Sequence, residues 1–247
     1  MAERRPKSAR FFHVVGGGCF GSQYVRWLLR ARSLGMLEFE KVFAVDRDPA
    51  CKLSREGPLD PACEIVARDW VEYLTGWLLG EVAGGLSESD YLVPSPLAPH
   101  LLLLSLLRAA ERKRPGLRFA AEPCTAEVPT PVRIPLASGN LALSFAQWQC
   151  PVNCIEPGIC PAIHAERSWD MLPTLRGFFS EHPEAGSAHV LQCCHYVHGV
   201  GAIPMGEIAR AFEVLLADLE KASTERVSVA TVSRCHGLVG TARVLRG

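Results

Sequence analysis

The first half of the chain alternates short apolar runs with longer segments in which apolar residues recur at helical spacing. The short runs predict strands at 11–16, 41–46, 63–67, 91–93 and 117–121. The longer segments predict helices at 20–33, 70–82 and 101–114. Because strands that alternate with helices favour a parallel sheet with helices on both faces, we predict an α/β fold with a doubly wound parallel sheet.

The pattern changes after residue 122, where prolines, cysteines and charged residues interrupt it as far as residue 170. Beyond two short strands in this region, regular elements return near the end of the chain. The predicted elements are strands at 132–134, 141–145, 189–196 and 227–232 and an amphipathic helix at 206–221. The predicted organisation is a disordered tail (1–10), a nucleotide-binding α/β half (11–122) and a Cys/His-rich α/β half (123–247).

The first predicted strand runs into a glycine-rich turn, G-x-G-x-x-G, formed by Gly16, Gly18 and Gly21. The first glycine permits a tight turn, the second lets a pyrophosphate approach the backbone, and the third lets the helix pack close to the strand. The helix N-terminus offers free N–H groups to a phosphate. The next strand ends at Asp46, whose carboxylate can accept hydrogen bonds from a ribose diol. We therefore predict a dinucleotide site.

This succession of strand, turn, helix, strand and acid resembles the NAD(P)-binding Rossmann superfamily over about the first half of the chain. The phrase VVGGGCFG is most similar to TrkA-type regulators of potassium transport and to dehydrogenases. The resemblance implies a Rossmann-like sheet and an NAD(P) cofactor. The cofactor-binding residues that follow are Gly16, Gly17, Gly18, Cys19, Phe20, Gly21, Asp46, Arg47 and Asp69.

The identity of the dinucleotide depends on two neighbouring side chains. Asp46 would bind a ribose diol and repel a 2′-phosphate, which favours NAD, whereas Arg47 could accept that phosphate and favour NADP. Asp69, at the end of the third strand, would lie near the adenine or cap the helix that follows it. We predict a preference for NAD.

A second motif, CPVNCIEPGICPAIH, occupies residues 150–164 and contributes three of the ten cysteines of the chain. Its prolines prevent regular strand pairing, so the loop needs another organiser. Thiolates favour zinc or an iron–sulfur cluster, although the spacing differs from ferredoxin runs and zinc ribbons. The predicted ligands are Cys150, Cys154 and Cys160, with a fourth from His164, Cys193, His195 or Cys235. Buried cysteines without a metal are the alternative.

Composition restricts the partners of the chain. The formal net charge is zero, which argues against a nucleic-acid-binding protein. The longest apolar run, 101–107, is far shorter than the roughly 20 residues of a membrane span. The basic first ten residues lack an apolar core and predict a tail rather than a signal peptide. We expect a cytoplasmic protein with a small-molecule dinucleotide as partner, no nucleic acid and no membrane span, and we leave a homodimer open.

Three functions are compatible with these motifs. The leading hypothesis is an NAD(P)-binding, oxidoreductase-like protein in which a zinc ion polarises a carbonyl or an iron–sulfur cluster carries electrons. The alternative is a non-catalytic nucleotide-binding regulator whose cysteine loop senses redox state or metal. A methyltransferase is the third, although the glycine spacing fits a dinucleotide better. Glu156, Arg167 and Asp170 flank the loop and would anchor a substrate or form salt bridges; the sequence identifies neither the substrate nor a catalytic residue.

Overall fold

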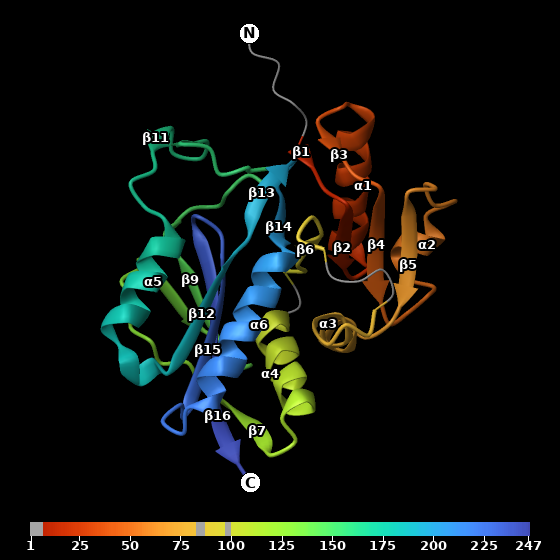
Figure 1. Ribbon diagram of the computed structural model, residues 1–247. Helices are drawn as coiled ribbons and strands as arrows, with labels where there is room; N and C mark the ends of the chain where they lie inside the picture. Colours follow the sequence, from red (N-terminus) through yellow and green to blue (C-terminus); the bar gives the residue numbers. More distant parts are fainter. Residues whose placement is uncertain (1–6, 83–86, 97–99) are drawn as a thin grey trace.

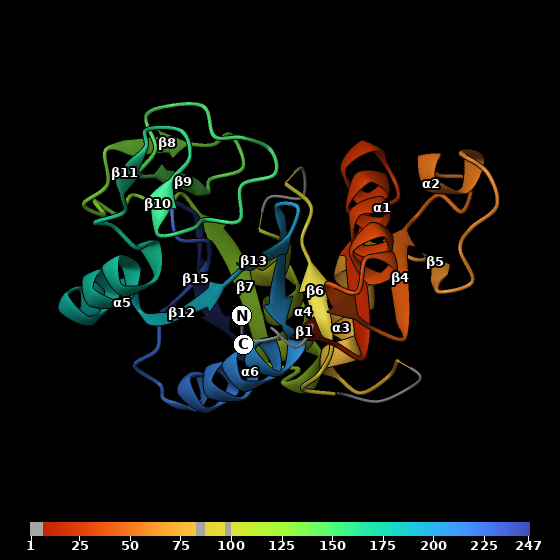
Figure 2. The ribbon, with the colours of Figure 1, turned by 90° about the horizontal axis from the view of Figure 1, so that it is seen from above.

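The computed structural model describes residues 7–82, 87–96 and 100–247. In these residues the chain is a mixed α/β protein in which two six-stranded sheets flank a layer of helices (Figures 1 and 2). The first sheet has the strand order β13-β14-β6-β2-β4-β5. The second has the order β12-β15-β16-β9-β8, and β7 pairs with β16 in addition.

The first sheet has a parallel centre and an antiparallel extension. Its strands are β2 (Phe11–Val15), β4 (Lys41–Asp46), β5 (Cys63–Ala67), β6 (Tyr91–Val93), β13 (Cys194–Val197) and β14 (Val200–Pro204). Strands β6, β2, β4 and β5 run parallel to their neighbours, whereas β14 and β13 are added antiparallel beyond β6. The buried side chains of helix α1 (Cys19–Ser33) pack on one face of this sheet. Helix α3 (Trp70–Leu78) lies on the other face.

The second sheet is built mostly from antiparallel pairs. Its strands are β7 (Leu117–Glu122), β8 (Val132–Pro135), β9 (Leu141–Ser144), β12 (Ser187–Gln192), β15 (Arg226–Val232) and β16 (His236–Arg246). Only the pair β12–β15 is parallel among the strand pairs of this sheet in the described residues. Alternate side chains of β15 contribute to different cores. Val227 and Val229 pack with helices α4 (Leu101–Lys113) and α6 (Met205–Glu220), and Ala230 and Val232 pack with α5 (Met171–Glu181).

The fold differs from the predicted doubly wound parallel sheet in one main respect. The run at 117–121 was expected to be a fifth parallel strand of the first half, but β7 pairs antiparallel with β16 in the second sheet. Conversely, β13 and β14 from the second half extend the first sheet. The reason is β16, an 11-residue strand that pairs with β9 along its first part and with β7 along its last part. The two halves of the chain therefore exchange strands, and the fold is a mixed α/β fold.

Short elements complete the described chain. They are β1 (Lys7–Ser8), β3 (Leu37–Glu38), α2 (Lys52–Arg55), β10 (Ile159–Cys160), β11 (Ala165–Glu166) and a 3₁₀ turn (Pro183–Ala185). The predicted tail falls partly outside the described residues, which begin at Lys7. Strand β1 pairs with β3, and Arg10 donates to the buried Asp90 at 2.8 Å. Within the described ranges, no helix combines the length and the apolar composition that crossing a membrane requires.

Helix α4 begins at a buried histidine whose tautomer is determined by its two neighbours. His100 Nδ1 accepts a hydrogen bond from the Leu103 amide at 3.1 Å, so Nε2 carries the proton and donates to the Leu238 carbonyl at 3.2 Å. The side chain thereby caps the helix and joins it to β16. Burial lowers the pKa of His100 to about 4, because a charged imidazole would lose its hydration there.

This histidine makes the stability of the fold depend on pH. The unfolded chain takes up a proton at His100 near pH 6.5, whereas the folded chain does so only near pH 4. Since the unfolded state binds more protons in this interval, the free energy of unfolding should fall by about 3 kcal/mol as the pH is lowered through it. Urea unfolding at a series of pH values measures this dependence. The variant His100→Asn retains a capping side chain but cannot titrate, so it should show a shallower slope; equal slopes would assign the effect to another group.

Candidate functional site

The cysteine loop lies between β9 and α5 (Figure 2). A buried carboxylate, Glu156, attaches it to the turn that follows β15. Glu156 is 8% exposed. It accepts hydrogen bonds from Ser233 Oγ at 2.7 Å, Arg234 N at 2.9 Å and Cys235 N at 3.2 Å. Burial alone would raise the pKa of Glu156, but the nearby His195 and these hydrogen bonds lower it. Glu156 is therefore an anion that brings the loop and Cys235 together.

Arg167 lies at the centre of the cysteines that this attachment gathers. It follows β11, and its amide donates to the Gly158 carbonyl at 2.9 Å. Its Nη2 donates to Cys154 Sγ at 3.7 Å. Its Nε and Nη1 are buried without a hydrogen-bond partner among the described residues. Burial alone would lower the pKa of Arg167, but the sulfur atoms of Cys235, Cys160 and Cys154 raise it. The guanidinium thus faces three thiols.

Each of these sulfur atoms also lies near N–H groups. Cys154 Sγ accepts from the Glu156 amide at 3.3 Å, and Cys235 Sγ accepts from Trp169 Nε1 at 3.3 Å. Burial alone would raise the pKa of Cys160, but the amides that follow it in the loop, then Arg167 and Trp148, lower it. Cys154 is partly exposed, whereas Cys160 and Cys235 are buried.

Cys150 completes the group, because its pKa is raised first by burial and then by Cys235, Cys154 and Cys160. The cysteine cluster is defined here as Cys150, Cys154, Cys160 and Cys235. In the part of the chain that the structure describes, however, no three His, Cys, Asp or Glu side chains are placed to hold a metal ion. The prediction of a zinc or iron–sulfur centre is therefore wrong. The physical reason is that the guanidinium of Arg167 supplies the positive charge that the sequence pattern assigned to a metal.

The other predicted ligands lie outside this group. His164 is exposed in the turn between β10 and β11, where its φ is 53°. His195 Nδ1 donates to the Cys154 carbonyl at 2.7 Å, so it contacts the backbone of the loop rather than a sulfur atom. Cys193 precedes β13 on the side of the sheet that His195 also occupies, and burial raises its pKa to about 12. These residues border the cluster without belonging to it.

The predicted dinucleotide residues lie around the glycine turn between β2 and α1. Asp46 accepts hydrogen bonds from the Gly17 amide at 2.7 Å and the Asp48 amide at 3.0 Å, so it holds the turn. The Leu53 amide of α2 donates to the Gly17 carbonyl at 2.9 Å. Asp69 caps α3 by accepting from the Val71 amide at 2.9 Å. Every one of these hydrogen bonds has a structural role.

The remaining predicted residues lie at the surface of the same turn. Gly16 adopts a positive φ of 86°, as the tight turn requires, and Gly18 has open space around it. Cys19 and Phe20 are exposed at the start of α1. Arg47 lies 3.5 Å from the Asp69 carboxylate. The structure therefore places the predicted residues close to one another.

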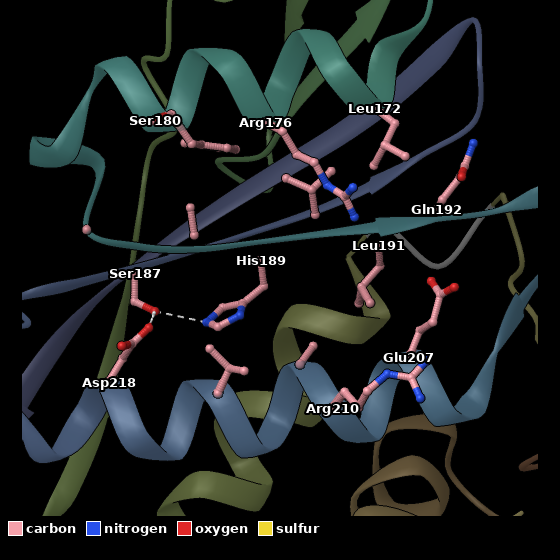
Figure 3. Close-up of a pocket in the computed structure, with 16 residues that line it drawn as sticks. Leu172, Arg176, Ser180, Ser187, His189, Leu191, Gln192, Glu207, Arg210 and Asp218 are labelled. Atoms are coloured by element: carbon pink, nitrogen blue, oxygen red, sulfur yellow. Dashed lines mark hydrogen bonds between the residues drawn. The ribbon is translucent and has the colours of Figure 1, made fainter. Parts of the chain in front are cut away.

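A groove of about 880 Å³ along β12, between α5 and α6, contains a serine, a histidine and an aspartate (Figure 3). Ser187 Oγ donates to Asp218 Oδ2 at 2.6 Å and lies 2.9 Å from His189 Nε2. Because the single hydroxyl proton goes to Asp218, the serine must accept from His189, which therefore cannot remove that proton. A hydrolytic triad needs the histidine between the other two residues. The groove is thus no serine-hydrolase site.

Comparison with known proteins shows that the cysteine cluster lies within the residues matched by a family model. Residues 101–245 match the family AF_1314_C, described as "Uncharacterized protein, C-terminal domain". The chain belongs to this family. The AF_1314_C match covers more than half of the chain and includes α4, the second sheet and all four cysteines of the cluster.

A relative of similar length supports this comparison. An uncharacterized protein of Archaeoglobus fulgidus is 27% identical over 244 residues, which cover 92% of this chain and 96% of that protein. No solved structure matches the chain.

The AF_1314_C match corrects the resemblance drawn from the glycine turn. The matching family is not an NAD(P)-binding Rossmann family, so the predicted membership in that superfamily, TrkA-type or dehydrogenase-like, is wrong. The predicted NAD(P) cofactor and the oxidoreductase assignment lose their support with it. The physical reason is that a glycine turn with an acid after the next strand also serves packing: Asp46 holds the Gly17 amide.

Sequence reasoning noted Arg167 and Glu156 only as residues that flank the loop, and it missed Ser233. Arg167 follows Cys160 by seven positions, and nothing in that spacing indicates that its side chain turns back among the thiols. Trp148 and Trp169 lie on the two sides of the cysteine loop in the sequence. A better signal was available, because tryptophans on both sides of a cysteine-rich loop bring N–H donors to sulfur.

Proposed function

We propose that this AF_1314_C chain is a thiol-based redox sensor whose responsive group is the cysteine cluster. The main support for this proposal is the environment of the Arg167 guanidinium. Two of its nitrogen atoms, Nε and Nη1, are buried without a hydrogen-bond partner among the described residues, and three cysteine sulfur atoms surround it. A buried donor without an acceptor costs about 1–3 kcal/mol. A thiolate accepts hydrogen bonds far better than a thiol does, so ionisation of a facing cysteine removes that cost.

The cluster divides its chemistry between an accessible and a buried cysteine. Cys154 is partly exposed, so a disulfide in solution can reach it, and its Sγ accepts N–H groups from Glu156 and Arg167. This position suits the entering nucleophile. Cys160 is buried beside the same guanidinium and has a lowered pKa, which suits the second, resolving thiolate. A disulfide between them would close a seven-residue segment of the loop.

The reaction is thiol–disulfide exchange with a low-molecular-weight disulfide, RS–SR. The Cys154 thiolate forms a bond to one sulfur of RS–SR and releases RS⁻. The Cys160 thiolate then bonds to Cys154 Sγ and releases the second RS⁻. Each RS⁻ takes the proton that one protein thiol has lost. Two protein thiols are oxidised to one disulfide, and RS–SR is reduced to two RSH.

Oxidation in glutathione redox buffers tests this proposal. We expect one disulfide per chain, between Cys154 and Cys160, found by peptide mass spectrometry. Limited iodoacetamide should label Cys154 at least tenfold faster than Cys63, a buried thiol whose pKa is raised to about 11. Arg167→Gln should slow labelling of Cys154 about tenfold, because the stabilising cation is lost.

Three variants control the experiment. Cys63→Ala should form the same disulfide as the unmodified chain, whereas Cys154→Ala and Cys160→Ala should each prevent it. Arg167→Lys keeps the charge and should restore part of the labelling rate. Failure to form any disulfide inside the cluster, or equal labelling of Cys154 and Cys63, would refute the proposed function.

A further inference from the structure

A second cavity, of about 630 Å³, opens at the carboxyl ends of β6 and β15, beside the cysteine loop but outside the cluster. In the first sheet, β2 is followed by α1 on one face, and the neighbouring β6 is followed by α4 on the other. Where successive connections leave a parallel sheet on opposite faces, a crevice forms at the ends of the strands. The second sheet closes this crevice with residues of β8, β9 and β16.

The wall of the cavity is mainly aliphatic. Leu101, Leu143 and Leu238 contribute to it, and two side chains at its edge, Ile134 and Val152, are 53% and 84% exposed. Large aliphatic side chains that remain in contact with water beside a concave surface are a sign of a binding site. An apolar ligand would remove them from water at about 25 cal/mol per Å² of buried surface.

The polar side chains of the wall are hydroxyls, a thiol and imidazoles. Among the described residues that line the cavity, none is Asp, Glu, Lys or Arg. Burial lowers the pKa of His236 and raises that of Cys193 to about 12, so both are neutral near pH 7. The carboxylate of the nearby Glu156 already accepts hydrogen bonds from Ser233, Arg234 and Cys235. A charged ligand would lose its hydration here and meet no counter-charge.

His195 provides the directional contact. Its Nδ1 faces the Cys154 carbonyl at 2.7 Å, and because a carbonyl can only accept, Nδ1 carries the proton. With Nδ1 protonated, the uncharged tautomer has its lone pair on Nε2, and His195 lines the cavity. Gly201 leaves room beside it, since a Cβ at Gly201 would lie 3.3 Å from Nε2 and 2.6 Å from Cys193 Sγ. Nε2 is thus an acceptor that calls for a donor on the ligand.

We propose that this cavity binds an uncharged, mainly apolar small molecule that carries a hydroxyl group. The hydroxyl donates to His195 Nε2, and the apolar body lies against the aliphatic wall. This site is separate from the thiol chemistry of the cysteine cluster, so neither proposal depends on the other.

Titration calorimetry of the full chain at pH 8 with three probes of equal length tests the proposal. The probes are 1-hexanol, hexanoate and hexylamine, which differ only in the group at one end. We expect 1-hexanol to bind at least tenfold more tightly than either charged probe. His195→Phe keeps a ring but removes the acceptor and should weaken 1-hexanol binding at least tenfold, whereas His182→Phe, a histidine outside the cavity, should not.

A spectroscopic measurement on the unmodified chain tests the same contact without depending on a variant that folds. In the unmodified chain, the imidazole ¹⁵N signal of His195 Nε2 should shift when 1-hexanol is added, while that of His182 stays in place. Absence of 1-hexanol binding, binding of hexanoate or hexylamine with equal or greater affinity, or an unchanged His195 signal would each overturn the proposal.

Discussion

Replacing Glu156 by alanine should lower the free energy of unfolding by about 4 kcal/mol, measured by urea denaturation. The side chain is buried, and its carboxylate accepts one hydroxyl and two amide hydrogen bonds from the turn at Ser233–Cys235. Hydrogen bonds to a charged group contribute about 1.5–3 kcal/mol each, and the loss of one partner leaves buried donors without an acceptor. The contributions do not simply add, because all three donors lie in one turn.

Two variants establish that the effect comes from these hydrogen bonds. Glu166→Ala removes an exposed carboxylate from the same loop and should change stability by less than about 0.5 kcal/mol. Glu156→Gln keeps the size of the side chain but turns an N–H group toward N–H donors, so it should destabilise nearly as much as alanine. If Glu156→Ala unfolds like the unmodified chain, the loop is held by other contacts.

Replacing Gly21 by alanine should destabilise the fold by about 4 kcal/mol, above the 1–3 kcal/mol that overpacking usually costs. A Cβ at Gly21 would lie 1.7 Å from the Gly16 carbonyl oxygen and 2.6 Å from its carbon. Both are backbone atoms that cannot rotate away, so α1 would have to move off β2. The packing of Val25 and Leu28 against the first sheet would be lost with that movement.

The same turn offers a matched control. A Cβ at Gly18, three residues earlier, meets no atom within 4 Å, so Gly18→Ala should change the free energy of unfolding by less than about 1 kcal/mol. Urea denaturation of the two alanine variants separates close packing from a general effect of side chains in the turn. Equal effects of Gly21→Ala and Gly18→Ala would contradict the packing explanation.

The strands and helices of the first half could be predicted from the sequence, because the spacing of apolar residues distinguishes strand from helix and glycine, proline or charged residues mark where each element ends. The run at 41–46 became β4 with the same bounds, and the run at 63–67 became β5. The apolar residues of β4 are consecutive because this strand lies between β2 and β5, whereas β5 is the edge strand of the sheet. Helix α1 follows the glycine turn, which the sequence shows directly.

Two elements of the second half were missed for local reasons. Helix α5 contains Pro173 and Gly177, which weaken a helical pattern, although a proline is tolerated in the first turn. Strand β16 contains two glycines and two arginines, so its alternation is faint. Its length is stabilised by pairing with the adjacent β15 and with β9 and β7, and the last two lie far from it in the sequence. Pairing partners of this kind leave no local signal.

The candidate site, too, was partly predictable from the sequence and partly determined by tertiary contacts. The sequence singled out the cysteines at 150, 154 and 160 because prolines between them leave the loop without strand pairing, and it named Cys235 as an addition. It could not indicate that a guanidinium would lie among them. That position depends on the β10–β11 hairpin, which directs Arg167 back toward the thiols, and on Glu156, which joins the loop to the turn beyond β15.

By itself, the sequence determined the α/β class, the bounds of the first strands and helices, and the concentration of cysteines in the second half. These depend on periodicity, glycine and proline positions and composition, all of which are local. Only the tertiary structure decided that the two halves exchange strands, that Asp46 holds the glycine turn, and that Arg167 provides the positive charge inside the cysteine cluster. Those outcomes depend on contacts between segments distant in the chain, where packing and buried charge select one arrangement among several that the local pattern permits.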